Sequence, residues 1–91
     1  MENILEISEI FTKLKSKEEV YSFLLELLTE SELIDISKRW RILKMLWDGC
    51  TQREISSELN VSLCKVTRGA KIIKNKNAVT TKYLKDINHD K

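Results

Sequence analysis

The chain has 91 residues, which predicts one domain with a thin core, because a monomer of this size buries only roughly 60–65% of its unfolded-chain surface. It has no proline, two glycines and a formal net charge of +2, from 16 Lys/Arg and 14 Asp/Glu. No apolar stretch reaches the roughly 20 residues that cross a bilayer, and the acidic start MENILEISEI is unlike a signal peptide, so a cytoplasmic location is expected.

Apolar residues, mostly Leu and Ile, recur three and four positions apart, which predicts an all-α fold of about six helices. The first helix is expected within residues 2–14 and the second within about 17–28, after a cap at Ser16. Their apolar stripes are Ile4, Ile7, Phe11 and Leu14 in the first helix, and Val20, Phe23, Leu24, Leu27 and Leu28 in the second. Each stripe needs a partner that covers it.

The third predicted helix is the longest and forms a central strut. Thr29 opens it with a capping signal, because Glu32 follows three residues later. Its stripe consists of Leu33, Ile36, Trp40, Leu43 and Trp47, widened by Ile42 and Leu46. Asp48 and Gly49 end the helix, since glycine readily adopts the left-handed conformation that follows many helix C-termini.

Residues 51–74 have the pattern of a helix-turn-helix, with two short helices about a tight turn. Thr51 and Glu54 are placed to form a capping box for the first helix. Asn60 tolerates the left-handed conformation of a turn, and Ser62 caps the second helix. The loop that joins the strut to this unit is short, so we expect a rigid connection.

Small residues lie inside the second helix of this unit, where Gly69 and Ala70 indicate close approach of another helix or of a ligand. A last amphipathic segment, residues 79–88, carries Val79, Tyr83, Leu84 and Ile87. The stripes together are wider than a monomer of this size buries, so we expect an intertwined homodimer whose contacts come from residues 2–48 and 79–88. A two-fold axis would place two recognition helices about 34 Å apart, which suits palindromic DNA.

Charge is unevenly distributed along the chain. Residues 1–49 hold seven Lys/Arg and ten Asp/Glu, a net charge of −3, whereas residues 50–91 hold nine and four, a net charge of +5. The basic half contains the predicted helix-turn-helix, as expected of a protein that neutralises DNA phosphates. A solvated lysine-rich surface would give the same charge pattern.

Neither a metal site nor an enzyme is expected. Cys50 and Cys64 lie outside any CxxC spacing and are predicted to be reduced thiols, and His89 is the only histidine. No nucleophile has a partner base nearby in the sequence. Cys64, on the second helix of the unit, is either an inert thiol or one that senses oxidation.

Four segments, LTESE, KRWRI, TQREI and VTRGAKIIK, stand in register with motifs of the tryptophan repressor family, and the chain resembles that family over residues 24–77. The connection around Cys50 is one residue shorter, as in a related branch of repressor-like proteins. The resemblance implies an intertwined all-helical dimer that acts as a transcriptional repressor. Its helix-turn-helix would read operator DNA, and an indole ligand would set the angle of that unit.

By this resemblance, DNA contacts come from the start of the first helix of the unit and the exposed face of the second. The matching positions are Gln52, Arg53, Leu63, Cys64, Lys65, Thr67 and Lys71. The residue types agree for most of them, because Gln52 and Lys65 bond phosphates or purine edges and Thr67 reaches a phosphate or a thymine methyl. Ser62 marks a helix N-terminus with free N–H groups. Leu63 either contacts DNA or packs inward.

The resemblance also implies an effector site. The two arginines that sandwich the indole match Arg39 and Arg68, and further positions of the site match Thr29, Ile42 and Gly69. Ile72 stands where the family has a serine beside the ligand, which weakens the anchoring of an amino acid. L-tryptophan, another indole and no effector therefore stay open, and without an effector the two arginines are surface or phosphate-binding residues.

Two further functions stay open at this stage. LTESE, a helix and then TQREISSELNVS also resemble the promoter-reading region of an RNA polymerase sigma subunit, although that region normally ends a much longer chain. The third function is a protein–protein adaptor in which the helix-turn-helix is only a packing unit. Such an adaptor would show no salt-dependent DNA binding.

Overall fold

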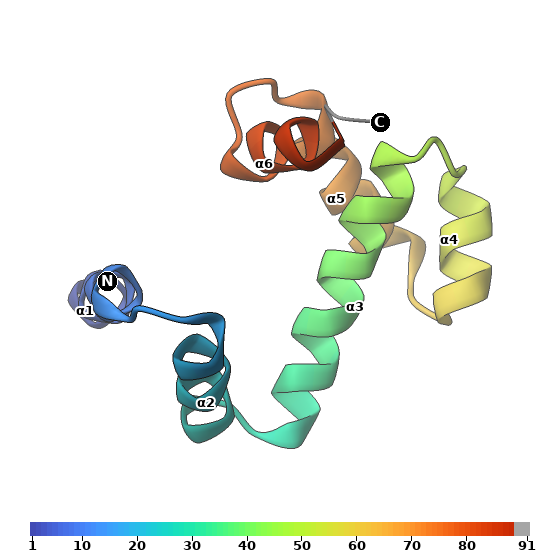
Figure 1. Cartoon of the computed structure of the whole chain (residues 1–91). Helices are drawn as coiled ribbons and strands as arrows, with labels where there is room; N and C mark the ends of the chain where they lie inside the picture. Colours follow the sequence, from blue (N-terminus) through green and yellow to red (C-terminus); the bar gives the residue numbers. More distant parts are fainter. Residues whose placement is uncertain (89–91) are drawn as a thin grey trace. The chain divides into compact units, whose positions relative to one another are not determined.

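The computed structural model describes residues 1–88, which form six helices and no strand (Figure 1). The helices are α1 (Glu2–Lys13), α2 (Lys17–Leu27), α3 (Glu30–Trp47), α4 (Gln52–Leu59), α5 (Leu63–Lys74) and α6 (Val79–Asn88). The prediction of an all-α fold with about six helices is confirmed. The single histidine, His89, lies outside the described residues.

The structure divides into two compact units, residues 1–34 and the residues from Asp35 onward, and α3 begins in the first unit and ends in the second. The first unit contains α1 and α2, and the second contains α4, α5, α6 and most of α3. The expectation of one domain over residues 1–91 stays a prediction.

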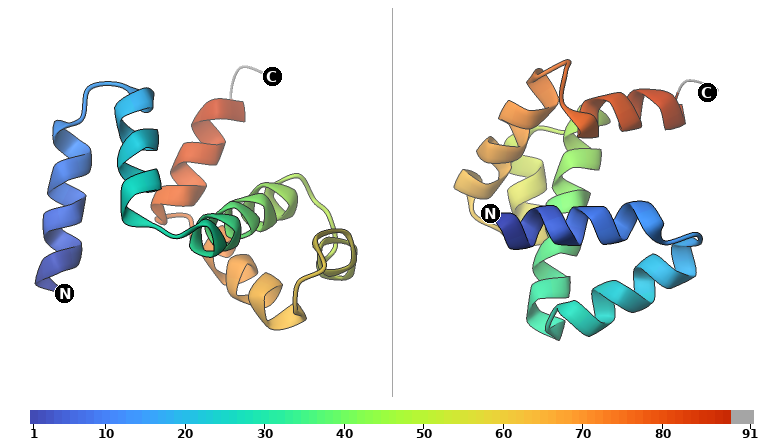
Figure 2. Two further views of the ribbon diagram at one scale, coloured as in Figure 1. Left: turned by 90° about the horizontal axis from the view of Figure 1, so that it is seen from below. Right: turned by 90° about the vertical axis from the view of Figure 1, so that its left-hand side faces the viewer.

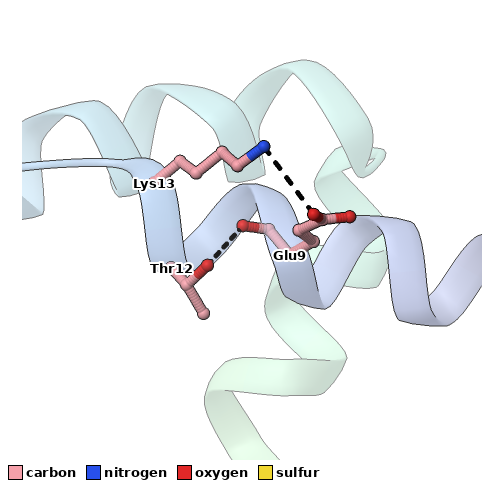
Figure 3. Close-up of polar contacts among 3 residues, drawn as sticks. All are labelled: Glu9, Thr12 and Lys13. Carbon is pink, nitrogen blue, oxygen red and sulfur yellow. Dashed lines mark hydrogen bonds and ion pairs between the residues drawn. The ribbon is translucent and has the colours of Figure 1, made fainter.

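In the first unit, α1 and α2 bury none of their residues. The chain reverses direction between the two helices in both views of Figure 2, and the rings of Phe11 and Phe23 meet edge to face with centroids 5.6 Å apart. Along α1, Lys13 Nζ lies 3.7 Å from a carboxylate oxygen of Glu9, and the Thr12 hydroxyl donates to the Glu9 carbonyl over 2.7 Å (Figure 3). Because α1 and α2 bury none of their residues, apolar side chains of this unit stay accessible to solvent. Leu5, for example, has 69% of its surface exposed.

The capping residues at the helix ends are those that the sequence predicts. Ser16 and Ser62 accept hydrogen bonds from the backbone N–H groups of Glu19 and Lys65, over 3.2 and 3.3 Å. Gly49 has a φ of +91° after α3. These observations confirm the predicted caps at Ser16, Ser62 and Gly49. Both serine caps join residues three apart, so the sequence alone could indicate them.

Two capping boxes define the starts of α3 and α4. The Thr29 and Glu32 backbone N–H groups donate to each other's side-chain oxygens over 2.8 and 3.2 Å. Thr51 and Glu54 exchange the same pair of bonds over 2.8 and 3.1 Å. Both boxes were expected from the sequence, and each satisfies two backbone donors that a helix start leaves unpaired.

The core of the second unit joins α3, α4 and α5. Its buried members are Ile42 and Met45 from α3, Ile55 from α4 and Val66 from α5, with Leu46, Cys50, Leu59 and Val61 packed around them. Ile36, which the sequence assigned to the apolar stripe of the third helix, is 46% exposed instead. Periodicity identifies a broad apolar side of a helix. The angle at which α4 and α5 pack against α3 decides that Ile42 and Met45 are the residues buried there.

The helix α6 packs against α5 and α3 in the second unit. Leu84 is 1% exposed, and the buried Thr81 hydroxyl donates to the Ile72 carbonyl of α5 over 3.2 Å. The rings of Tyr83 and Trp40 lie 6.0 Å apart between centroids. Most of the other face of α6 stays exposed, and Val79 at its start is 84% accessible.

Candidate nucleic-acid interface and ligand cleft

The helices α4 and α5 form a fixed pair about a three-residue turn. Asn60 adopts the left-handed conformation, with a φ of +53°, as the sequence predicts. The Ser56 hydroxyl donates to the Val61 carbonyl over 2.6 Å, and the Val61 N–H donates back to the Ser56 carbonyl over 3.1 Å. Ile55 and Val66, each fully inaccessible, pack in the core that the two helices share. Backbone and core contacts therefore both hold the angle between α4 and α5.

A side-chain hydrogen bond joins the start of α4 to the middle of α5. The Thr67 hydroxyl donates to the side-chain oxygen of Gln52 over 2.9 Å. Because this oxygen is the acceptor, the amide NH2 of Gln52 keeps its two donors. The structure therefore brings together two predicted DNA-contacting residues that are 15 positions apart in the sequence.

The predicted DNA-contacting residues all lie on α4, α5 or the turn that joins them. Gln52 is half-buried, and the others are exposed: Arg53, Ser62, Leu63, Cys64, Lys65, Thr67 and Lys71. Leu63 keeps 49% of its surface exposed, so it does not pack inward beside Val66. The Ser62 hydroxyl is used in capping α5 and accepts from the Lys65 N–H.

Hydrogen bonding to Thr51 lowers the pKa of the Glu54 carboxyl at the start of α4. The pKa of the Glu54 carboxyl lies below its ordinary value of 4.5, chiefly because it accepts a hydrogen bond from the Thr51 backbone N–H, and further because of the Thr51 hydroxyl. Glu32 has a lowered pKa for the same reasons, through Thr29 at the start of α3. Both carboxylates are fully exposed, so salt and water screen their charges.

We expect the variant Glu54→Gln to lose pH-dependent stability. Because the folded pKa of Glu54 is lowered, the carboxylate stabilises the fold above pH 4.5, and this contribution is lost as the pH falls through the folded pKa. Urea unfolding of both proteins, measured from neutral pH to below pH 4.5, should therefore show that the parent is more stable at neutral pH. The difference in the free energy of unfolding between the two proteins should shrink in acid. A difference that stays constant with pH would contradict the assignment, and Glu32 serves as an internal control because it is unchanged in both proteins.

A cleft of about 190 Å³ lies between α3 and α5 within the second unit. Its lining residues are Arg39, Ile42 and Leu43 from α3, and Lys65, Arg68, Gly69 and Ile72 from α5. Gly69 makes the close approach possible, because a Cβ atom there would lie 3.0 Å from Ile42 Cγ2 and 3.2 Å from Leu46 Cδ1. The prediction that the small residues of the second helix mark close approach is thus explained by packing against α3.

Four of the five residues that the family resemblance assigned to an effector site line this cleft, namely Arg39, Ile42, Arg68 and Gly69. The fifth, Thr29, lies in the first unit, where it caps α3. Sequence reasoning missed that Lys65 also lines the cleft. The spacing of positions 65, 68, 69 and 72 is the signal that could have shown it, because residues three and four apart share one helical face.

Neither cysteine takes part in a metal or disulfide site among the described residues. Cys50 is half-buried, Cys64 is exposed, and both are free thiols. Residues 1–88 contain no group of three or more His, Cys, Asp or Glu side chains placed to hold a metal ion. In the same part of the chain, every helix is too short or too polar to span a bilayer.

Comparison with known proteins identifies the family. The family model described as "Trp repressor protein" matches residues 2–88. A "Trp operon repressor homolog" of Chlamydia caviae is 31% identical over 81 residues, which cover 88% of this chain and 80% of that protein. Proteins of the same description from Chlamydia trachomatis serovar D and Xylella fastidiosa strain M23 are each 37% identical, covering 72% and 76% of this chain and 76% of each relative. No solved structure gives a significant match. The chain therefore belongs to the Trp repressor family.

Proposed function

We propose that this protein is a sequence-specific DNA-binding transcriptional repressor that binds palindromic operator DNA as a homodimer. The observation that carries the proposal is the exposed polar and basic surface of the α4–α5 pair in a chain of this family. It also fits the description of the relatives as Trp operon repressor homologs. Gln52 and Arg53 begin α4, while Lys65, Thr67 and Lys71 lie on the exposed side of α5.

The chemistry of this surface suits a nucleic-acid duplex. Arg53, Lys65 and Lys71 provide positive charge that replaces counterions along the phosphate backbone. The amide NH2 of Gln52, oriented by its bond to Thr67, is a donor for a phosphate or a purine acceptor. Lys65 and Thr67 are the residues of α5 that we propose to read base edges, with Leu63 and Cys64 in apolar contact at its first turn.

Homodimer formation is the second part of the proposal. In α1 and α2 no residue is buried, and leucines such as Leu5 and Leu25 are 69% and 48% exposed. A second copy of the chain would cover this apolar surface, which water otherwise solvates at a cost of roughly 25 cal/mol per Å². We therefore expect sedimentation analysis to give a dimer mass at micromolar concentrations. A monomer mass that is independent of concentration would contradict this part of the proposal.

The cleft between α3 and α5 is the proposed effector site, with L-tryptophan or another indole as corepressor. Arg39 and Arg68 line it, and planar guanidinium groups stack well on an aromatic ring. Because α5 carries both this lining and the proposed DNA-reading residues, a ligand in the cleft would bias the angle at which α5 meets DNA. Thr29 lies in the first unit and stays an effector-binding residue by the family resemblance alone. A cytoplasmic location follows from the proposed role in transcription.

The test is a selection of bound DNA from a random duplex pool, run with and without L-tryptophan. We expect a palindromic site whose enrichment depends on the effector, and affinities that fall steeply as salt is raised. A protein that enriches no sequence and whose binding does not vary with salt would instead be an adaptor. Enrichment of a single asymmetric site would contradict the symmetric dimer.

A further inference from the structure

We infer that Thr67 is a positioning residue: its hydroxyl fixes the amide of Gln52 as a hydrogen-bond donor, and that donor, rather than the hydroxyl, bonds an acceptor on DNA. This inference rests on the proposed DNA-binding function and adds a division of roles between two residues of the α4–α5 surface. The acceptor is a phosphate oxygen or an atom of a purine edge, since both accept from a neutral N–H donor.

The hydrogen bond between Thr67 and Gln52 differs in kind from the other polar contacts. The Thr67 hydroxyl donates to Gln52 Oε1 over 2.9 Å. Among the side chains that the structure describes, this is the one hydrogen bond that joins two side chains, because the others pair a side chain with a backbone atom. It spans 15 positions of the sequence, so it belongs to no helix cap or turn.

The angle between α4 and α5 is already held by other contacts. Ser56 and Val61 exchange two hydrogen bonds across the turn, and Ile55 and Val66 pack in the shared core. An exposed bond between neutral groups adds little to such a pair, because water competes for both partners. The main effect of the Thr67 hydroxyl is therefore local, and it restricts the side chain of Gln52.

The bond leaves Gln52 in a defined state for contact with DNA. A glutamine side chain has an acceptor oxygen and an NH2 group with two donors, and Thr67 bonds the oxygen. Gln52 is half-buried at the start of α4, between the exposed Thr51 and Arg53. A donor that is already held loses less freedom on binding than a mobile side chain, and ordering one side chain corresponds to roughly 2- to 12-fold in affinity.

Thr67 keeps its methyl group for direct contact with DNA. Its hydroxyl hydrogen is used by Gln52, so the hydroxyl does not donate to DNA while this bond is made. The methyl group is left for apolar contact with a thymine methyl. Thr67 therefore takes part in the proposed base reading through its methyl group and, indirectly, through Gln52. Two variants separate these roles, because Thr67→Val removes the hydroxyl and Thr67→Ser removes the methyl.

A double-mutant cycle on the full chain tests the inference, with affinity for the selected operator duplex measured by fluorescence anisotropy. We expect Thr67→Val to weaken binding about fivefold or more in the parent, but less than about twofold in the Gln52→Met background, where no donor is left to position. In the Thr67→Ser background, Gln52→Met should cost as much as in the parent, because the bond is kept. The control Ser57→Ala removes another exposed hydroxyl from α4 and should leave the affinity unchanged.

Two further measurements separate positioning from a general loss of structure. Neither Gln52 nor Thr67 carries a charge, so the slope of log affinity against log salt should keep the parent value in each variant. In the free protein, NMR relaxation of the Gln52 NH2 group should show more ps–ns motion in Thr67→Val than in the parent, and the parent motion in Thr67→Ser.

The pattern of lost affinity identifies the acceptor on DNA. If Gln52→Met and Thr67→Val both relax the preference at one purine position, the acceptor is an atom of that base. If both variants weaken all sequences by the same factor, the acceptor is a phosphate oxygen. Either pattern supports the inference, because the two variants share it.

Additive effects of Gln52→Met and Thr67→Val on affinity would overturn the inference, because Thr67 would then act on DNA by itself. Equal motion of the Gln52 NH2 group in the parent and in Thr67→Val would overturn it as well. Both results leave the proposed repressor function standing, since the parent still binds its operator. A parent that binds no duplex DNA would instead contradict the proposed function, and the inference with it.

Discussion

Replacing Ile55 with alanine is expected to lower the free energy of unfolding by about 2–5 kcal/mol, as measured by urea denaturation. Ile55 is fully inaccessible and packs in the cluster with Ile42 and Val66, so the lost methyl and methylene groups leave a cavity that the neighbouring helices fill only in part. Because small domains have only about 5–15 kcal/mol of stability, this variant should be close to unfolding at 37 °C.

The matched control is Leu63→Ala, which removes an aliphatic side chain from the exposed first turn of α5. Leu63 is 49% accessible, and surface substitutions usually change stability by less than about 0.5 kcal/mol. A large loss of stability in Leu63→Ala would show that this residue is buried in the protein in solution. An equal effect of both variants would therefore contradict the core described above.

The substitution Arg53→Ala is expected to weaken binding to every DNA sequence by a similar factor. Arg53 is exposed on the first turn of α4, outside both the core and the cleft, so its loss should leave fold and ligand binding unchanged. If it contacts a phosphate in each subunit of the dimer, the slope of log affinity against log salt should fall by about two. Fluorescence anisotropy of a labelled duplex at several salt concentrations measures this slope.

A control variant and two alternative outcomes test the assignment of Arg53 to a phosphate contact. Lys76→Ala, at an exposed position in the turn between α5 and α6, removes one positive charge outside the proposed DNA-contacting residues and the expected dimer contacts, and should keep the parent slope. Loss of preference at a single base position in Arg53→Ala, with the salt slope unchanged, would instead make Arg53 a reader of that base. A slope and affinity equal to those of the parent would remove Arg53 from the interface.

Features that depend on neighbours in sequence could be predicted well. The capping boxes at Thr29 and Thr51, the left-handed residues Gly49 and Asn60, and the six helices themselves follow from contacts within three or four positions. Because such contacts depend only on residues within one helical turn, the residue types that form them can be recognised in the sequence. Tertiary packing adds little to them.

Features that depend on how helices meet could be predicted only in part. Met45 is buried and Ile36 exposed, although the periodicity of α3 favoured the second, because the packing angle of α4 and α5 decides which part of an apolar face is covered. Arg39 and Arg68 were placed together through a family resemblance rather than through spacing. Lys65 was assigned to DNA alone, although its spacing from Arg68, Gly69 and Ile72 places it on the helical face that borders the cleft.

The inaccessible position of Ile42 restricts how the proposed effector site can change during evolution. Ile42 lies in the core with Met45 and also forms part of the cleft wall, so a substitution there would alter stability and ligand fit together. Arg68 and Ile72 belong to the same cleft but not to that core cluster, so they are free to vary at lower cost. The proposed effector site should therefore change its specificity through Arg68 and Ile72, while Ile42 stays the same.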